Sequence, residues 1–230
     1  MKAFRFQQFY IQQSKDVFRV GTDGVLLGVL VSVSDAKSAL EIGVGSGLIS
    51  LMLAQRNSDL QIDGIDVNPQ AVELTQRNFN DSPFSERLHV FLSDFNEWMP
   101  NRKYDLIFSN PPYFEINDSK KDVLARQQKE LSFSQLVSNA SNLLSESGLF
   151  SVIIPAESFL EFESLATENC LYLNRKVSIF GIENGPLKRV VLEFSKDKKT
   201  LIEEGFVIEK SPRKYSDHYL ELTKEFHIFS

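Results

Sequence analysis

Two hydrophobic periods alternate along this chain from residue 38 to about residue 170. Short apolar runs have the length and the β-branched or aromatic content of buried strands. Between them lie longer segments whose apolar residues recur every three to four positions, which is typical of helices. The predicted strands are 38–42, 61–66, 88–92, 104–108 and 149–154. The predicted helices are 48–54, 68–79, a helix that starts at Ser132 or Ser134 and is ended by Gly148, and 156–170.

Regular alternation of strand and helix predicts a parallel sheet with helices on both faces. Two further strands, 176–180 and 189–194, follow each other directly and add one antiparallel strand at or near the edge. We therefore predict an α/β fold built on a seven-stranded, mostly parallel sheet. Residues 1–30 are expected to form a hairpin and a helix entry, 31–195 the main domain, and 196–230 an extension packed on that domain.

The first 30 residues allow more than one interpretation. Residues 1–20 mix aromatic and cationic side chains, so the predicted hairpin is either an arm that contacts RNA or a cover over one edge of the core. Residues 20–28 predict the start of a helix capped by Thr22 or Asp23. Its flanking glycines let backbone approach a ligand, and its N-terminus favours an anionic group such as the carboxylate of an amino acid.

Polar residues stand at the carboxyl ends of the predicted strands, where ligands bind in open α/β sheets. Glu41 and Gly43 end the first strand, whereas Asp66, Asp94 and Asn110 end the next three. Because these ends meet at one rim of the sheet, their polar residues predict a binding site there.

A glycine-rich turn links the first predicted strand to its helix. Position 48 is leucine, so the dinucleotide-binding fingerprint fails, and the phosphate-binding Gly-Lys-Ser/Thr sequence is also missing. Glu41 suits a ligand that carries an ammonium group, and Asp66, about 20 positions after the turn, suits the two hydroxyls of a ribose. The three glycines that allow a tight turn are Gly43, Gly45 and Gly47.

The fourth predicted strand ends in the sequence Asn-Pro-Pro-Tyr. Two prolines cannot continue a strand ladder, and they hold the chain in a stiff, extended corner. Asn110 offers a hydrogen-bond acceptor and a donor, and Tyr113 offers a flat ring, a set that suits a flat substrate with an amino or amide nitrogen. The alternative is a proline-stiffened loop, because Asn-Pro dipeptides commonly form turns.

Residues 110–113 match the signature of S-adenosylmethionine-dependent N-methyltransferases, and the glycine turn resembles motif I of the class I methyltransferases. The resemblance implies a Rossmann-like fold and S-adenosyl-L-methionine as the cofactor. It also implies catalytic roles for three residues. The Asn110 side chain and the Pro111 carbonyl accept hydrogen bonds from the target amino group, and Tyr113 stacks on the base.

Longer segments resemble the bacterial tRNA adenine-N6 methyltransferases, which modify adenine 37 beside the anticodon of tRNA(Val). The similarity covers nearly the whole chain, with departures at residues 14–18, Val44 and Ser46. It implies tRNA as the partner. The segments that carry it are 9–12, 20–28, 51–56, 109–114, 125–132 and 215–219.

The expected site has two sets of binding residues. In the cofactor set, Asp94 would accept a hydrogen bond from the adenine amine, with Phe95 against the ring, although a turn or a helix cap at Ser93-Asp94 is the alternative. In the substrate set, cations after Tyr113 and near residue 185 would meet RNA phosphates, although a solvated surface is the alternative. The cofactor set is Thr22, Glu41, Gly43, Gly45, Gly47, Asp66, Asp94 and Asn110. The substrate set is Pro112, Tyr113, Phe114, Lys120, Lys121, Arg126, Lys188 and Arg189.

Composition argues against several classes of protein and of site. The net charge of −6 argues against a protein that coats nucleic acid, although it allows recognition of one RNA site. The single cysteine, Cys170, rules out an internal disulfide framework, and no cysteine–histidine spacing predicts a metal site. No stretch approaches the ~20 apolar residues of a membrane span. We expect a cytoplasmic monomer without a metal.

Three alternatives to tRNA methylation remain open. The same signature occurs in enzymes that methylate a glutamine amide of release factors. A DNA adenine methyltransferase is a second alternative, although no separate target-recognition segment is visible. The third is a non-catalytic protein that binds RNA or senses the cofactor, against which the intact Asn110–Tyr113 set argues.

Overall fold

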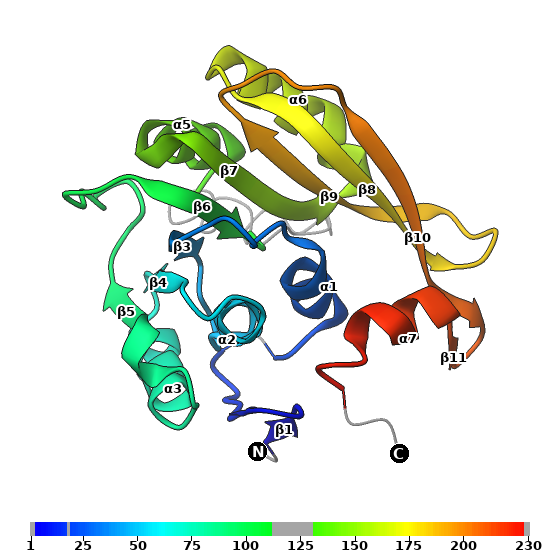
Figure 1. The fold of residues 1–230 in the computed structure, drawn as a ribbon, viewed down its shortest axis with the longest axis horizontal. Coiled ribbons are helices and arrows are strands. Elements are labelled where there is room, and N and C mark those ends of the chain that lie inside the picture. The colour runs from blue at the N-terminus through cyan, green and yellow to red at the C-terminus, as the bar shows by residue number, and fades with distance from the viewer. Residues whose placement is uncertain (1–2, 18, 112–130, 228–230) are drawn as a thin grey trace, which may run out of the picture.

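The computed structural model describes residues 3–17, 19–111 and 131–227. Within this part of the chain, one nine-stranded sheet with the order β11-β10-β8-β9-β7-β6-β3-β4-β5 forms the centre of the molecule (Figure 1). Its strands are β3 (Ser38–Ile42), β4 (Gln61–Asp66), β5 (Leu88–Leu92), β6 (Tyr104–Ser109), β7 (Leu144–Pro155), β8 (Tyr172–Ile182), β9 (Leu187–Ser195), β10 (Ile202–Ser211) and β11 (Lys214–Tyr215).

The sheet is mostly parallel, as predicted. Strands β5, β4, β3, β6 and β7 pair in parallel, and β9 is inserted antiparallel between β7 and β8. The predicted antiparallel strand therefore exists, but it lies inside the sheet. Two strands were not predicted: β10 pairs in parallel with β8, and the short β11 pairs antiparallel with β10. In β10 only Phe206 is buried, and the apolar run of this strand is short, residues 206–208.

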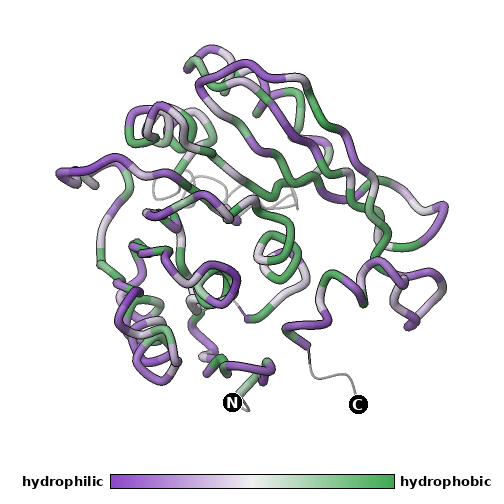
Figure 2. Tube along the Cα trace, in the orientation of Figure 1, coloured by the Kyte–Doolittle hydropathy of each residue, from purple (hydrophilic) through white to green (hydrophobic). Residues whose placement is uncertain are grey.

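Helices cover both faces of the sheet (Figure 1). The core on one face joins side chains of α1, α2, α3 and α7, and the core on the other joins side chains of α5 and α6. Figure 2 shows that α1 is hydrophobic along its length, whereas α3 carries a hydrophilic outer surface. The helices are α1 (Thr22–Leu30), α2 (Leu48–Arg56), α3 (Pro69–Asn80), α5 (Phe133–Leu143), α6 (Phe159–Glu168) and α7 (Asp217–Thr223).

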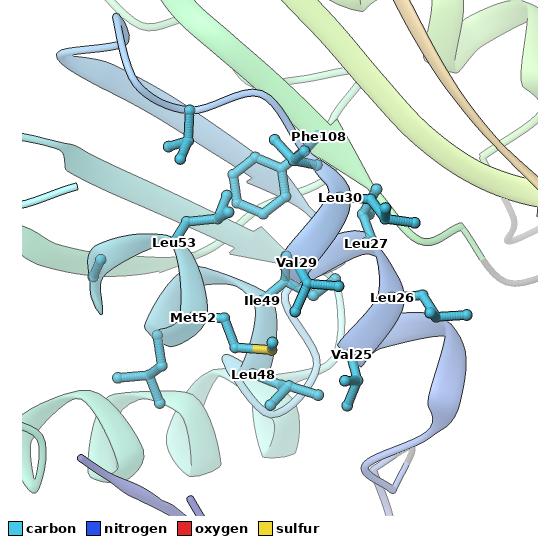
Figure 3. Packing of buried hydrophobic residues seen from close by; sticks show 14 of the residues in the cluster. Val25, Leu26, Leu27, Val29, Leu30, Leu48, Ile49, Met52, Leu53 and Phe108 are labelled. Atoms are coloured by element: carbon cyan, nitrogen blue, oxygen red, sulfur yellow. The ribbon is translucent and has the colours of Figure 1, made fainter. Parts of the chain in front are cut away.

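Close packing between α1 and α2 supports the glycine turn that precedes α2 (Figure 3). A Cβ at Gly28 would lie 2.6 Å from the Met52 sulfur, and one at Gly24 would lie 3.2 Å from Leu48. These two glycines therefore bring the helices together, whereas the sequence suggested that glycines here let backbone approach a ligand. Phe108 of β6 packs into the same cluster.

The N-terminal hairpin of β1 (Phe4–Arg5) and β2 (Tyr10–Ile11) covers the core. Phe6, Phe9 and Ile11 are buried, and the rings of Phe6 and Phe9 stack 4.7 Å apart. Phe6 also forms a β-bridge with His227 near the other end of the chain. Of the two interpretations of this segment, the structure thus supports the cover, because Phe6 and Phe9 are buried inside the molecule, although Tyr10 is exposed.

Candidate functional site

Strand register brings the predicted site residues to one rim of the sheet. Ile42 pairs with Ser109 on one side and with Ile65 on the other, and the Ser109 hydroxyl donates a hydrogen bond to the Ile42 carbonyl (2.8 Å). The residues that follow these strand ends, Gly43 and Asn110, are therefore neighbours. Asp66 ends β4 in the same row.

The turn between β3 and α2 has the backbone conformation that glycine favours. Gly43, Gly45 and Gly47 have φ angles of 74°, 57° and 78°. A Cβ on Gly43 would meet nothing within 4 Å, so this glycine borders open space. A Cβ on Gly47 would lie 2.6 Å from the Phe79 ring, so this glycine is also needed for packing against α3.

Asp66 connects this turn to the next strand. One carboxylate oxygen accepts a hydrogen bond from the Gly45 amide (3.0 Å), and the other accepts from the Asn68 amide (2.9 Å). Asn68 in turn caps α3 through the Gln70 amide. Both oxygens are thus fixed by backbone, and each retains acceptor capacity for a hydroxyl of a ligand.

Glu41 lies below the turn and is buried. Its carboxyl accepts hydrogen bonds from the Ser50 amide (3.0 Å) and from the Ser50 hydroxyl. Burial raises the pKa of Glu41 to about 8, the bonds from Ser50 oppose this shift, and the charge of Asp66 adds to it. The structure thus gives Glu41 a partner within the protein, and its contact with a ligand ammonium group stays a prediction.

Asp94 lies next to Asp66, because the Ser93 amide donates a hydrogen bond to the Asp66 carbonyl (3.1 Å). One Asp94 oxygen accepts from the Asn96 amide (2.8 Å), which makes a local turn. The expectation for Phe95 was wrong, because its side chain is buried in the core. Val67 directly follows Asp66 and is 61% exposed, so it offers an apolar surface at this rim that sequence reasoning missed.

Asn110 and Pro111 come directly after β6, with Asn110 half-buried and Pro111 buried. Their position is fixed by the pairing of Ser109 with Ile42 and Val152 in the two neighbouring strands. The remaining residues predicted for the corner and the downstream loop lie outside the described residues: Pro112, Tyr113, Phe114, Lys120, Lys121 and Arg126.

The start of α1 lies beside the start of β9. The Arg189 guanidinium forms an ion pair with Asp23 (3.1 Å), whereas Lys188 is exposed. The structure therefore brings Arg189 close to Thr22, which is also exposed. The predicted helix cap was wrong: Gly21 occupies the N-cap position and no side chain caps α1, because Asp23 is turned to Arg189.

Two residues of α3 that sequence reasoning missed hold the glycine turn. The Thr75 hydroxyl donates to the Gly45 carbonyl (2.8 Å), and the Asn78 side-chain amide donates to the Ser46 carbonyl (2.8 Å). Both side chains are fully buried. The sequence does not show which polar residues of a helix contact a distant turn. Only the tertiary structure therefore reveals these two contacts.

The rim fits a ligand that carries an amino acid and a nucleoside. In the described part of the chain, the carbonyl of Gly43 and the amide of Ser46 have no hydrogen-bond partner, and Gly43 borders open space. Such a carbonyl can accept from an ammonium group and such an amide can donate to a carboxylate. The Asp66 carboxylate lies one strand away. These groups suit S-adenosyl-L-methionine.

Neither a metal-binding cluster nor a membrane-spanning helix is present among the residues that the structure describes. No group of three or more histidine, cysteine, aspartate or glutamate side chains in residues 3–17, 19–111 and 131–227 is placed to hold a metal ion. None of the described helices is long and apolar enough to cross a membrane.

Comparison with known proteins identifies the family. Residues 13–178 match the family described as "Methyltransferase small domain". A protein named tRNA1(Val) (adenine(37)-N6)-methyltransferase from a Flavobacteriaceae bacterium (strain 3519-10) is 51% identical over 230 residues, which is 100% of both chains. A protein of the same name from Flavobacterium psychrophilum is 40% identical, over 98% of this chain and 99% of its own.

A solved structure supports the fold independently. The crystal structure of a predicted O-methyltransferase from Agrobacterium tumefaciens superposes with a TM-score of 0.71, covering 89% of this chain and 96% of that one at 16% identity. It confirms the Rossmann-like methyltransferase fold that the strand pattern and motifs predicted. The chain belongs to the methyltransferase small domain family, and within it to the group of its tRNA1(Val) (adenine(37)-N6)-methyltransferase relatives.

Proposed function

We propose that this protein transfers a methyl group from S-adenosyl-L-methionine to N6 of adenine 37, beside the anticodon of tRNA1(Val). The observation that carries the proposal is the 51% identity along the full chain to a relative of that name. The site supports it, because Asn110 and Pro111 stand beside the glycine turn at the carboxyl rim of the sheet.

The cofactor would be held by groups from three neighbouring strand ends. S-adenosyl-L-methionine supplies a methyl group on a sulfonium, which is already electrophilic. Asp66 would accept hydrogen bonds from the ribose hydroxyls, and the Gly43 carbonyl would accept from the ammonium group. Asp94 would face the adenine amine, and Thr22 would approach the amino acid end from the start of α1. Glu41, which lies beneath the glycine turn, would attract the ammonium group of the cofactor.

Asn110 and Pro111 would hold the acceptor nitrogen. The lone pair of an adenine amine is delocalised into the ring, so this nitrogen is a poor nucleophile. Acceptors at the Asn110 side chain and the Pro111 carbonyl would draw its hydrogens out of the ring plane and localise the lone pair. Asn110 does not act as a proton base at neutral pH. Its contribution is orientation and charge stabilisation, about 3–4 kcal/mol by analogy with other preorganised hydrogen-bonding groups.

The RNA would be bound by rings and cations around this corner. The target base must leave its stack and lie against Tyr113, a contact worth about 1–3 kcal/mol. Pro112 and Phe114 would complete the pocket, and Lys188 and Arg189 would meet phosphates from the β9 side. The cations Lys120, Lys121 and Arg126 would contact RNA from the segment after the corner.

We further propose that the protein acts as a cytoplasmic monomer. Residues 31–195 would form the catalytic unit, and the two terminal segments would complete its structure. The pairing of β10 with β8 and the bridge between Phe6 and His227 support the role of the terminal segments in completing this unit.

Methyl transfer to two acceptors tests the proposed function. Purified protein is incubated with labelled S-adenosyl-L-methionine and either tRNA from cells that lack the protein or a release factor. We expect label in tRNA, recovered as N6-methyladenosine after nuclease digestion. Label in a glutamine of the release factor would contradict the proposal in favour of protein methylation, and transfer to neither acceptor would contradict the enzyme assignment.

A further inference from the structure

The backbone of the glycine turn shows which of its groups face the protein. The amides of Gly43 and Val44 both donate to the Ile65 carbonyl, and the Gly47 amide donates to the Val44 carbonyl (2.8 Å). The Gly45 amide is taken by Asp66. Among the described residues, the Ser46 amide has no partner.

Thr75 determines the direction of this amide. The Gly45 carbonyl and the Ser46 amide belong to one trans peptide, in which C=O and N–H point to opposite sides. Because the Thr75 hydroxyl binds the Gly45 carbonyl (2.8 Å), that carbonyl points to α3. The Ser46 N–H therefore points away from α3.

A glycine turn can present its peptides in more than one way. Glycine at positive φ lies in a region that it enters and leaves at little cost, so the peptide beside Gly45 can rotate unless it is held. A rotated peptide would turn a carbonyl oxygen outward and repel an anionic ligand. The N-terminus of α2, which begins at Leu48, favours an anion at the same place.

We propose that Thr75 is a positioning residue for the cofactor. Its hydroxyl fixes the Gly45–Ser46 peptide so that the Ser46 amide donates a hydrogen bond to the carboxylate of S-adenosyl-L-methionine. This inference rests on the proposed function only for the identity of the cofactor. It assigns a cofactor-binding role to two residues, Thr75 and Ser46, that the motif does not mark.

Thr75 is a cleaner test than its neighbour Asn78. Asn78 holds the Ser46 carbonyl, but its side chain also binds the backbone of Gln12 twice, at 2.9 and 3.2 Å. Its replacement would release the N-terminal segment together with the turn. The Thr75 hydroxyl makes its one hydrogen bond to the turn. Replacing Thr75 by valine therefore removes that contact alone and keeps the shape of the side chain.

Calorimetric binding of S-adenosylhomocysteine measures the effect. We expect Thr75→Val to raise the dissociation constant ~5- to 10-fold and Thr75→Ser, which keeps the hydroxyl, to bind within about threefold of the parent. Turnover at saturating cofactor should stay near that of the parent, while KM for the cofactor rises. Thr223→Val is the matched control, because this buried hydroxyl also donates to a carbonyl, that of Tyr219 (2.7 Å), but lies in α7.

Hydrogen exchange in the parent protein gives a second test, which does not depend on whether the Thr75 variants fold. Saturation with S-adenosylhomocysteine should slow hydrogen exchange of the Ser46 amide at least ~10-fold, because the amide becomes hydrogen-bonded. The Gly45 amide, already bound to Asp66, should change less. Unchanged Ser46 exchange, or parent-like binding by Thr75→Val, would overturn the inference while leaving the proposed function intact. Failure of the parent to bind S-adenosylhomocysteine would overturn both.

Discussion

Replacing Asp66 by asparagine should separate cofactor binding from fold stability. The two Asp66 oxygens accept from different backbone amides, Gly45 at 3.0 Å and Asn68 at 2.9 Å. Asparagine has one acceptor oxygen, so its NH₂ group must face one of these N–H donors. The loss of one charge-assisted hydrogen bond to the backbone lowers the stability of the fold by about 2 kcal/mol, and the loss of a charged acceptor weakens ribose binding by about the same amount. We expect S-adenosylhomocysteine to bind about 30-fold more weakly to Asp66→Asn.

Asp105→Asn is the matched control for this experiment. Asp105 also accepts from two backbone amides, those of Lys37 and Ser38, both at 3.1 Å, but it lies at the start of β6 and not at its end. Both variants should lower the melting temperature, whereas only Asp66→Asn should weaken binding measured by calorimetry. Binding by Asp66→Asn within threefold of the parent, or equal weakening in Asp105→Asn, would refute the placement of the ribose at Asp66.

Three further variants probe other parts of the site. Asn110→Ala should keep S-adenosylhomocysteine binding while methyl transfer to tRNA falls at least ~10²-fold, and near-normal turnover would contradict its role. Burial raises the pKa of Glu41 to about 8 from 4.5, so the folded protein holds an extra proton between these values and its stability falls as pH rises through them. Glu41→Gln should remove this slope in denaturation experiments at pH 5 to 8, and an unchanged slope would place the titration elsewhere. Lys188→Gln should weaken tRNA binding in a filter assay ~3- to 10-fold at low salt, and equal weakening by Lys37→Gln at the opposite rim would indicate a nonspecific charge effect.

The position of the site could be predicted from the sequence because strand ends carry strong signals. Apolar runs located the strands, and parallel pairing then placed Gly43, Asp66 and Asn110 in one row. The glycine turn was equally clear, since all three glycines have the positive φ that only glycine adopts easily. These features depend on local sequence and on one rule of sheet topology, that the carboxyl ends of parallel strands meet at one rim.

Features that depend on distant contacts were not predicted. β10 has an apolar run of only three residues, 206–208, of which Phe206 alone is buried, so the sequence did not mark this strand between β8 and the short edge strand β11. Thr75 acts through a turn 30 positions earlier in the chain, and no local pattern marks that contact. Asp23 resembled a helix cap in the sequence, but its partner Arg189 comes from β9, which reaches α1 only in the folded protein.

The position of the methyl group on tRNA shows whether adenine 37 is the target of this protein. An unmodified transcript of tRNA1(Val) and one with guanine at position 37 are each incubated with the protein and S-adenosyl-L-methionine, and nuclease fragments are analysed by mass spectrometry. We expect N6-methyladenosine in the anticodon-loop fragment of the first transcript and no methylation of the second. Equal methylation of both transcripts, or of neither, would contradict this expectation.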